Sequence, residues 1–207
     1  MEQGTKKFSF RHMSNKIESF MMQKLHPDWP WWPKEAVLLC SKLLKATDIV
    51  LEFGSGRSTF WIANRCAGIT SIEHNEDWYN IVKKKITQSN IDSKVKLIYA
   101  PITDDSISEK QPYLSPVKDI ANSSVDVVIV DGKHRAQAAV LSLPLLKPGA
   151  ILIIDDAHRY LPKRGSNDVF PESKSQEIWK DIDLQTKDWR SLWTSDGVHA
   201  TYFLIKP

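Results

Sequence analysis

Acidic residues stand at the ends of apolar runs that are expected to form buried strands. One run ends at Asp131, and another ends at the pair Asp155 and Asp156. Ligands of an open, mostly parallel sheet bind beyond the carboxyl ends of the strands, so these three carboxylates are expected to converge in one cleft. Converging carboxylates raise one another's pKa unless a cation lies among them, and their hard oxygen atoms suit Mg²⁺, Mn²⁺ or Ca²⁺. The sequence therefore predicts a divalent-metal site at Asp131, Asp155 and Asp156.

A glycine turn follows the apolar run 49–53 and consists of Gly54, Ser55 and Gly56. The two glycines let the backbone bend sharply and approach a ligand without a side chain in the way. Ser58 or Thr59 is expected to open and cap the next helix, whose free N–H groups face the same ligand. This order of strand, turn and helix indicates a nucleotide-type cofactor.

The spacing of glycines and acids bears on which cofactor binds. A dinucleotide fingerprint requires a third glycine where this chain has Thr59, which weakens an NAD-type oxidoreductase but leaves it as an alternative. Glu73 ends the next apolar run, about 19 residues after Gly54, and a carboxylate there can accept hydrogen bonds from both ribose hydroxyls of an adenosine.

Two glycines in the turn and an acid, Glu52, within the strand form the pattern of S-adenosylmethionine (SAM) enzymes. The chain resembles the class I SAM-dependent methyltransferases over about residues 35 to 207. The resemblance implies SAM as methyl donor and assigns the ribose to Glu73. It places Glu52 near the methionine amine of SAM, with a structural anchor for the turn as the alternative. The cofactor-binding residues that it implies are Glu52, Gly54, Ser55, Gly56, Ser58, Thr59, Glu73, His74 and Asp131.

The acids at the later strand ends are similar to those of the catechol and caffeoyl-CoA type O-methyltransferases. This resemblance implies that Asp131 and the pair Asp155 and Asp156 hold a metal that binds the acceptor hydroxyl and lowers its pKa. A basic residue three positions after the first acid takes the proton in that family; here His134 replaces the usual lysine, with Lys133 beside it. The candidate catalytic residues are thus Asp131, Lys133 and His134. The segment 130–135 also looks like the Asp-Gly-x-His-Arg pattern of other small-molecule methyltransferases, in which a metal is not assured.

Strands and helices alternate along the chain. After the first strand, the expected strands are 69–73, 95–99, 125–130 and 151–154, and the expected helices are 77–89, 136–146 and 177–186. Residues 192–194 and 201–205 are expected to form a closing hairpin. The prediction is an α/β fold: a doubly wound, mostly parallel, seven-stranded Rossmann-like methyltransferase sheet with a C-terminal antiparallel hairpin.

Residues 1–34 are expected to form a helical and aromatic extension ahead of a SAM-binding domain at 35–207. Apolar residues at helical spacing between 17 and 25 predict a short amphipathic helix. The segment 26–33 holds three prolines and three tryptophans and is either an aromatic plug over the sheet edge, which is favoured, or a substrate lid. The loops 101–124 and 157–173 are expected to shape the acceptor pocket, with Asp104 or Asp105 near the adenine.

The amino-acid composition limits the class of protein to which the chain belongs. The chain is 42% hydrophobic and 26% charged, as in folded domains, and its net charge of +3 is too small to indicate nucleic acid. Two cysteines read as buried thiols, and no apolar stretch suits a membrane span or a signal peptide, so a cytoplasmic location is expected.

The sequence thus predicts a SAM-dependent methyltransferase that acts on a small-molecule hydroxyl oxygen, with SAM and Mg²⁺ (or Mn²⁺ or Ca²⁺) as cofactors. A methyltransferase that acts on nucleic-acid bases is disfavoured, because Asp131 begins the sequence Asp-Gly-Lys-His and not an Asn/Asp-Pro-Pro-aromatic motif. A SAM-binding protein without catalysis is the other alternative. No nucleic-acid or membrane partner is expected, and a homo-oligomer is compatible with the sequence.

Overall fold

The computed structural model describes residues 10–103 and 111–207, with side chains from residue 13 onward. Asp104 and Asp105 lie outside the described residues. The strands are β1 (Ile49–Phe53), β2 (Gly68–Glu73), β3 (Val95–Tyr99), β4 (Val125–Val130), β5 (Leu146–Ile154), β6 (Arg190–Ser195) and β7 (Ala200–Ile205). The helices are α1 (Phe10–Leu25), α2 (Lys34–Leu43), α3 (Arg57–Ala63), α4 (Glu76–Gln88), α5 (Arg135–Ser142) and α6 (Gln176–Gln185), with the 3-10 turns η1 (Pro112–Asp119), η2 (Leu143–Leu145) and η3 (Ala157–Arg159).

The strands form one seven-stranded sheet in the order β3-β2-β1-β4-β5-β7-β6. β1 pairs in parallel with β2 and β4, and β5 pairs in parallel with β4. β7 and β6 are antiparallel and close the sheet as the expected hairpin. The predicted fold class is confirmed, and the carboxyl ends of β1, β2, β4 and β5 meet at one edge.

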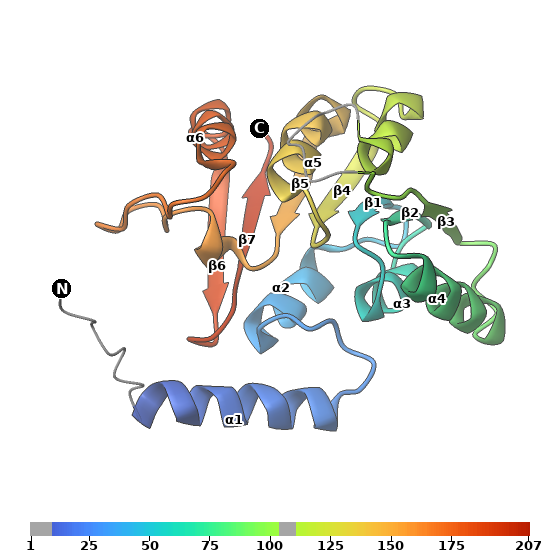
Figure 1. Ribbon diagram of the computed structural model, residues 1–207, viewed down its shortest axis with the longest axis horizontal. Coiled ribbons are helices and arrows are strands. Elements are labelled where there is room, and N and C mark those ends of the chain that lie inside the picture. Colours follow the sequence, from blue (N-terminus) through green and yellow to red (C-terminus); the bar gives the residue numbers. More distant parts are fainter. Residues whose placement is uncertain (1–9, 104–110) are drawn as a thin grey trace.

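Helices cover both faces of the sheet (Figure 1), and alternate strand residues point into two apolar clusters. Leu51 and Phe53 of β1 pack in the cluster beneath α5, α6 and η1, whereas Val50 packs in the cluster with α2, α3 and α4. This alternation follows from the period of two residues in a strand. Both cysteines, Cys40 and Cys66, are buried free thiols as expected, and burial raises the pKa of Cys40 to about 12.

Two predicted boundaries were wrong. The helix expected to reach residue 146 ends at Ser142, and η2 follows it because Pro144 has no N–H to continue the helix. β5 then begins at Leu146, opposite Val125, and not at residue 151, so Pro148 and Gly149 lie within the strand although these residue types favour turns.

The start of α3 also differs from the prediction. The helix begins at Arg57 with Gly56 as its N-cap, so neither Ser58 nor Thr59 caps it. Thr59 lies at the third helical position, where its Oγ1 accepts a hydrogen bond from the Gly56 N–H at 2.9 Å. Thr59 therefore stabilises the start of the helix from within its first turn and not from the N-cap position.

The tryptophans of the aromatic segment 26–33 differ in burial. Trp32 is buried in the cluster with α2 and α3, as a plug would be, whereas Trp31 is exposed. The predicted amphipathic helix is present as α1 and is longer than expected. Within the described chain, no helix combines the length and apolarity that crossing a membrane requires.

Candidate active site

The cleft lies at the edge of the sheet. At its base, the backbone of the turn after β1 contacts the backbone of the turn after β4. Gly54 has φ +89°, and a Cβ built on it would lie 2.7 Å from both the N and Cα atoms of Gly132. A Cβ on Gly132 would collide with the Tyr113 hydroxyl. The two glycines are therefore needed for this close approach, which brings the cofactor turn and Asp131 to one place.

Glu73 ends β2 beneath the turn and is buried. Its Oε2 accepts hydrogen bonds from the N–H and the hydroxyl of Ser55, at 3.0 and 3.1 Å. Its Oε1 accepts from the N–H groups of His74 and Asn75, at 2.9 and 2.8 Å. Burial acts to raise the pKa of Glu73, but hydrogen bonds outweigh it, led by that of the His74 side chain, whose Nδ1 lies 3.0 Å from Oε1, so the pKa is lowered and the carboxylate stays charged.

Glu52 is fully buried and is not among the residues that line the cleft. Its Oε2 accepts hydrogen bonds from Thr59 at 2.5 Å and from Ser71 at 2.6 Å, and Thr59 in turn accepts from Gly56. The structure therefore favours the anchor role for Glu52, since it fixes the glycine turn from behind. Burial, opposed by hydrogen bonds from Ser58, Ser71 and Thr59, raises the pKa of Glu52 from 4.5 to about 7.

We expect Glu52→Gln to change the pH dependence of folding stability. Because the folded-state pKa of Glu52 lies above its unfolded value, the stability this group contributes is complete below pH 4.5 and is lost as pH rises through 7. The free energy of unfolding of the wild type should thus fall by about 3 kcal/mol relative to Glu52→Gln between pH 4.5 and 7.5. Urea denaturation across this range measures the difference.

The matched control is Glu172→Gln, which changes an exposed carboxylate. Its stability should follow the wild type at every pH. A pH-independent difference between the wild type and Glu52→Gln would contradict a raised pKa at Glu52.

Asp131 follows β4 and lines the cleft with its side chain partly exposed. Arg135 lies one helical turn later, and its guanidinium contacts Asp131 Oδ1 at 3.0 Å. The same guanidinium donates to the backbone carbonyls of Asp131, Gly132 and Asp155. Burial raises the pKa of Asp131, and the charge of Arg135 partly opposes this. Arg135 was missed at the sequence level, although its i,i+4 spacing from Asp131 was a usable signal.

The structure does not support the metal site predicted at Asp131, Asp155 and Asp156. Asp155 is buried, accepts a hydrogen bond from Thr201 at 2.8 Å, and has its pKa raised well above the ordinary value by burial and by Asp131. Asp156 has φ +51° and pairs with Arg159 at 3.2 Å. In the part of the chain that the structure describes, no three His, Cys, Asp or Glu side chains are grouped for a metal ion. The guanidinium of Arg135 contacts Asp131, so a positive charge already lies beside the first of these carboxylates.

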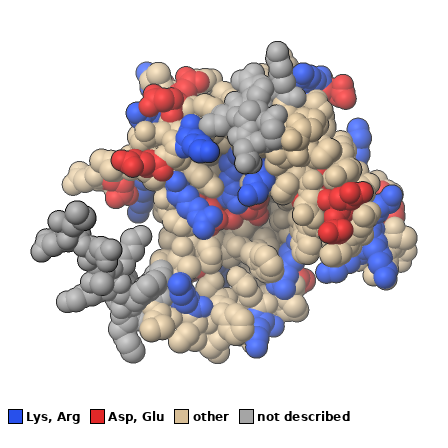
Figure 2. Space-filling view, viewed as in Figure 1, with Lys and Arg blue, Asp and Glu red and all other residues tan. Residues whose placement is uncertain are grey.

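The two basic candidates differ in their access to the cleft. Lys133 lines both the cleft and a neighbouring cavity of about 590 Å³, whereas His134 lines that cavity and not the cleft. His134 has φ +48° and is the N-cap position of α5, which explains why its side chain departs from the cleft. Lys133, Arg135 and Lys174 line that cavity, and none of the described residues that line it is acidic. Figure 2 shows Lys and Arg side chains around the hollow in the middle of this face, with acidic side chains deeper in it.

The cleft has a volume of about 1200 Å³, large enough for a nucleoside-type ligand. Ser55, Gly56, Ser58 and His74 line it, whereas the buried Thr59 does not. Arg57, which sequence reasoning also missed, lines it with a buried Nη1 that has no hydrogen-bond partner. Its guanidinium lies 5.2 Å from the centre of the Trp31 ring. An unpaired cationic donor in a cleft suits an anionic ligand group.

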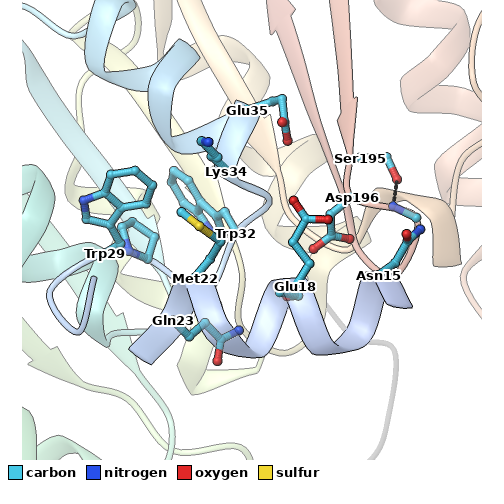
Figure 3. A pocket seen from close by; sticks show the side chains of 13 residues that line it. Asn15, Glu18, Met22, Gln23, Trp29, Trp32, Lys34, Glu35, Ser195 and Asp196 are labelled. Carbon is cyan, nitrogen blue, oxygen red and sulfur yellow. Dashed lines mark hydrogen bonds between the residues drawn. The ribbon is translucent and has the colours of Figure 1, made fainter. Parts of the chain in front are cut away.

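A second cavity of about 640 Å³ lies between α1, the aromatic segment and the β6–β7 turn (Figure 3). Trp29 and Trp32 form its aromatic side, and Glu18, Glu35 and Asp196 supply carboxylates. Trp32 lines this cavity and Trp31 lines the cleft, so the aromatic segment lies between the two. The lower edge of the cavity is the polar face of α1.

A family model described as a methyltransferase domain matches residues 51–157, which include β1 to β5 and every strand end described above. No curated protein matches the chain in sequence.

Solved structures resemble the chain at low identity. The O-methyltransferase TomG from Streptomyces achromogenes, solved with SAM, superposes with a TM-score of 0.57 at 15% identity over 82% of this chain and 77% of that chain. An O-methyltransferase from Bacillus cereus, solved with S-adenosylhomocysteine (SAH), gives 0.59 at 16% over 93% and 91%. A methyltransferase from Geobacter sulfurreducens gives 0.56 at 12% over 94% and 89%. At these identities the likeness shows the shared fold.

Proposed function

Because the chain belongs to the methyltransferase family, we propose that it transfers the methyl group of SAM to a hydroxyl oxygen of a small-molecule acceptor. The family membership bears out the resemblance to class I SAM-dependent methyltransferases and replaces the NAD-type alternative. One observation carries the proposal: the glycine turn, the charged Glu73 and a carboxylate with a raised pKa, Asp131, line one cleft. Cavities of about 590 and 640 Å³ beside the cleft have the size of small-molecule pockets.

Glu73 and Arg57 are proposed to hold the two ends of SAM. Glu73 accepts the ribose hydroxyls in exchange for the Ser55 hydroxyl that it now binds. Arg57 binds the methionine carboxylate, which supplies its buried Nη1 with a partner. Ser55, Gly56 and Ser58 line the cleft between these two groups.

SAM supplies an activated methyl group, so much of the rate comes from aligning the acceptor oxygen with it. Asp131 is the proposed base, in place of His134, because it lies in the cleft and its raised pKa makes it a better proton acceptor. Lys133, beside it, stabilises negative charge that develops on the acceptor oxygen. Arg135 fixes Asp131 and supplies positive charge there, so the proposal uses no metal ion. A cytoplasmic location remains part of the proposal.

The test is calorimetric titration with SAH, with NAD and with 5′-methylthioadenosine, which has the ribose but lacks the amino-acid carboxylate. We expect the first and third ligands to bind and NAD not to bind. Glu73→Gln should weaken SAH and 5′-methylthioadenosine alike, by about 2 kcal/mol or some thirtyfold, because it removes charged hydrogen bonds to the ribose.

Arg57→Met is the paired variant in this test. It should weaken SAH by a similar factor and leave 5′-methylthioadenosine unchanged. Equal losses for both ligands in Arg57→Met would contradict its role, and binding of NAD in preference to SAH would contradict the proposed function. SAH release from SAM with a panel of hydroxylated small molecules then separates an enzyme from a SAM-binding protein without catalysis.

A further inference from the structure

Helix α1 presents its polar side to the protein and its apolar side to solvent. Asn15, Glu18, Ser19, Met22 and Gln23 line the cavity of Figure 3. Five large apolar side chains on the other side are between 56% and 67% exposed: Met13, Ile17, Phe20, Met21 and Leu25. A surface helix ordinarily buries its apolar stripe, so this outward apolar face requires an explanation.

Contacts of its polar side fix α1 in this orientation. Gly197, in the β6–β7 turn, lies so close to Asn15 that a Cβ there would collide with the Asn15 side chain. Ser19 and, from the same turn, Asp196 line one cavity together with Asn15. Directly after α1, His26 stacks on Trp29 with ring centres 4.0 Å apart, which orders the segment where the helix ends. Rotating α1 to bury its apolar side would separate Asn15 from the β6–β7 turn.

We propose that this apolar face packs against the same face of a second copy of the chain, with the two helices antiparallel. Met13, Ile17, Met21 and Leu25 recur at intervals of four positions, Phe20 lies three positions after Ile17, and together they form one seam along the helix. An antiparallel pair with its two-fold axis near residue 19 places Met13 opposite Leu25 of the other copy. The same register places Ile17 opposite Met21, so the face is complementary to itself, as a two-fold interface requires.

The exposed area favours a second copy. The five side chains expose on the order of 500 Å², more than half of the roughly 800 Å² that one partner buries in a standard interface. Lys24 lies 4.7 Å from the centre of the Phe20 ring, so an anionic lipid surface is the competing occupant that the vesicle experiment below tests. α1 lies along one edge of the molecule (Figure 1), which leaves its outer side open to another copy.

Sedimentation and light scattering of the full chain at micromolar concentration test the proposal, with a dimer as the expected result. Ile17→Glu combined with Phe20→Glu should raise the dimer dissociation constant at least ~100-fold, because two anchors become charged. Leu184→Glu, at a position 64% exposed on α6, is the matched control and should remain dimeric. Circular dichroism and the melting temperature establish that each variant is folded.

Single-cysteine variants test the direction of the helices. An equimolar mixture of Ile17→Cys and Met21→Cys should form intermolecular disulfides faster than either variant alone, since the native cysteines are buried. Faster crosslinking of the separate variants would indicate parallel helices and overturn the register. A wild-type monomer would overturn the proposal, and so would a monomer that binds vesicles of phosphatidylcholine and phosphatidylserine.

Discussion

Gly54→Ala is expected to lower the free energy of unfolding by about 3 kcal/mol. It is also expected to abolish measurable binding of SAH. An alanine at φ +89° costs about 1–2 kcal/mol in backbone conformation. Its Cβ would also meet backbone atoms of Gly132 at 2.7 Å, and overpacking of this kind typically costs about 1–3 kcal/mol. Any relaxation separates the turn from Asp131, so the cleft is damaged even where the chain still folds. Urea denaturation and calorimetry with SAH measure the two losses.

Gly149→Ala is the matched control, because Gly149 has φ +78° and nothing lies within 4 Å of a Cβ built there. It carries the conformational cost without the collision and should lose about 1 kcal/mol while keeping SAH affinity. Equal losses for the two variants would mean that the contact between the Gly54 and Gly132 turns contributes nothing to stability or to the site.

The fold was predictable because its local signals agree with its tertiary pairing. The apolar runs of β1 and β4 are buried on both faces, as strands in a covered parallel sheet are. The start of β5 was not predictable, because Leu146 pairs with Val125 across the sheet ahead of an irregularity in the register. Pro148 and Gly149 lie in this irregularity, where Gly149 has φ +78°, so the strand contains the bend that these residues favour.

The candidate site was predictable in its position but not in its chemistry. Acids at strand ends were expected at one edge, and the structure places Glu73 and Asp131 there. Which groups neutralise them depends on side-chain direction, which spacing alone does not specify. The left-handed backbone of Asp156 places its carboxylate beside Arg159, and Arg135 contacts Asp131, the first acid of the predicted metal site. The outward orientation of the apolar face of α1 was not predictable for the same reason. The periodicity of apolar residues defines a stripe on the helix but not whether that stripe faces the protein or the solvent.

Asp131→Asn is expected to lower kcat by about 10³ while SAH affinity changes less than about threefold, because a positioned base contributes 10²–10⁴ to rate. The amide keeps the shape of the carboxylate and can still accept from Arg135, but it cannot take a proton. Asp126→Asn, which removes a surface carboxylate paired with Lys147, is the control and should keep its activity. The assay is SAH release with the best acceptor of the hydroxylated panel.

The pH profile separates a base from a structural carboxylate at Asp131. Burial raises the pKa of Asp131 above its ordinary value, and a base must be ionised to act, so kcat/KM of the wild type should rise with pH through that raised pKa and then level off. Asp131→Asn should lose this rise. Since Arg135 provides the positive charge beside Asp131, EDTA should change the wild-type rate less than about twofold. A rate that EDTA abolishes and Mg²⁺ restores would return the metal to the mechanism, and an unaltered pH profile in Asp131→Asn would assign the proton to another group.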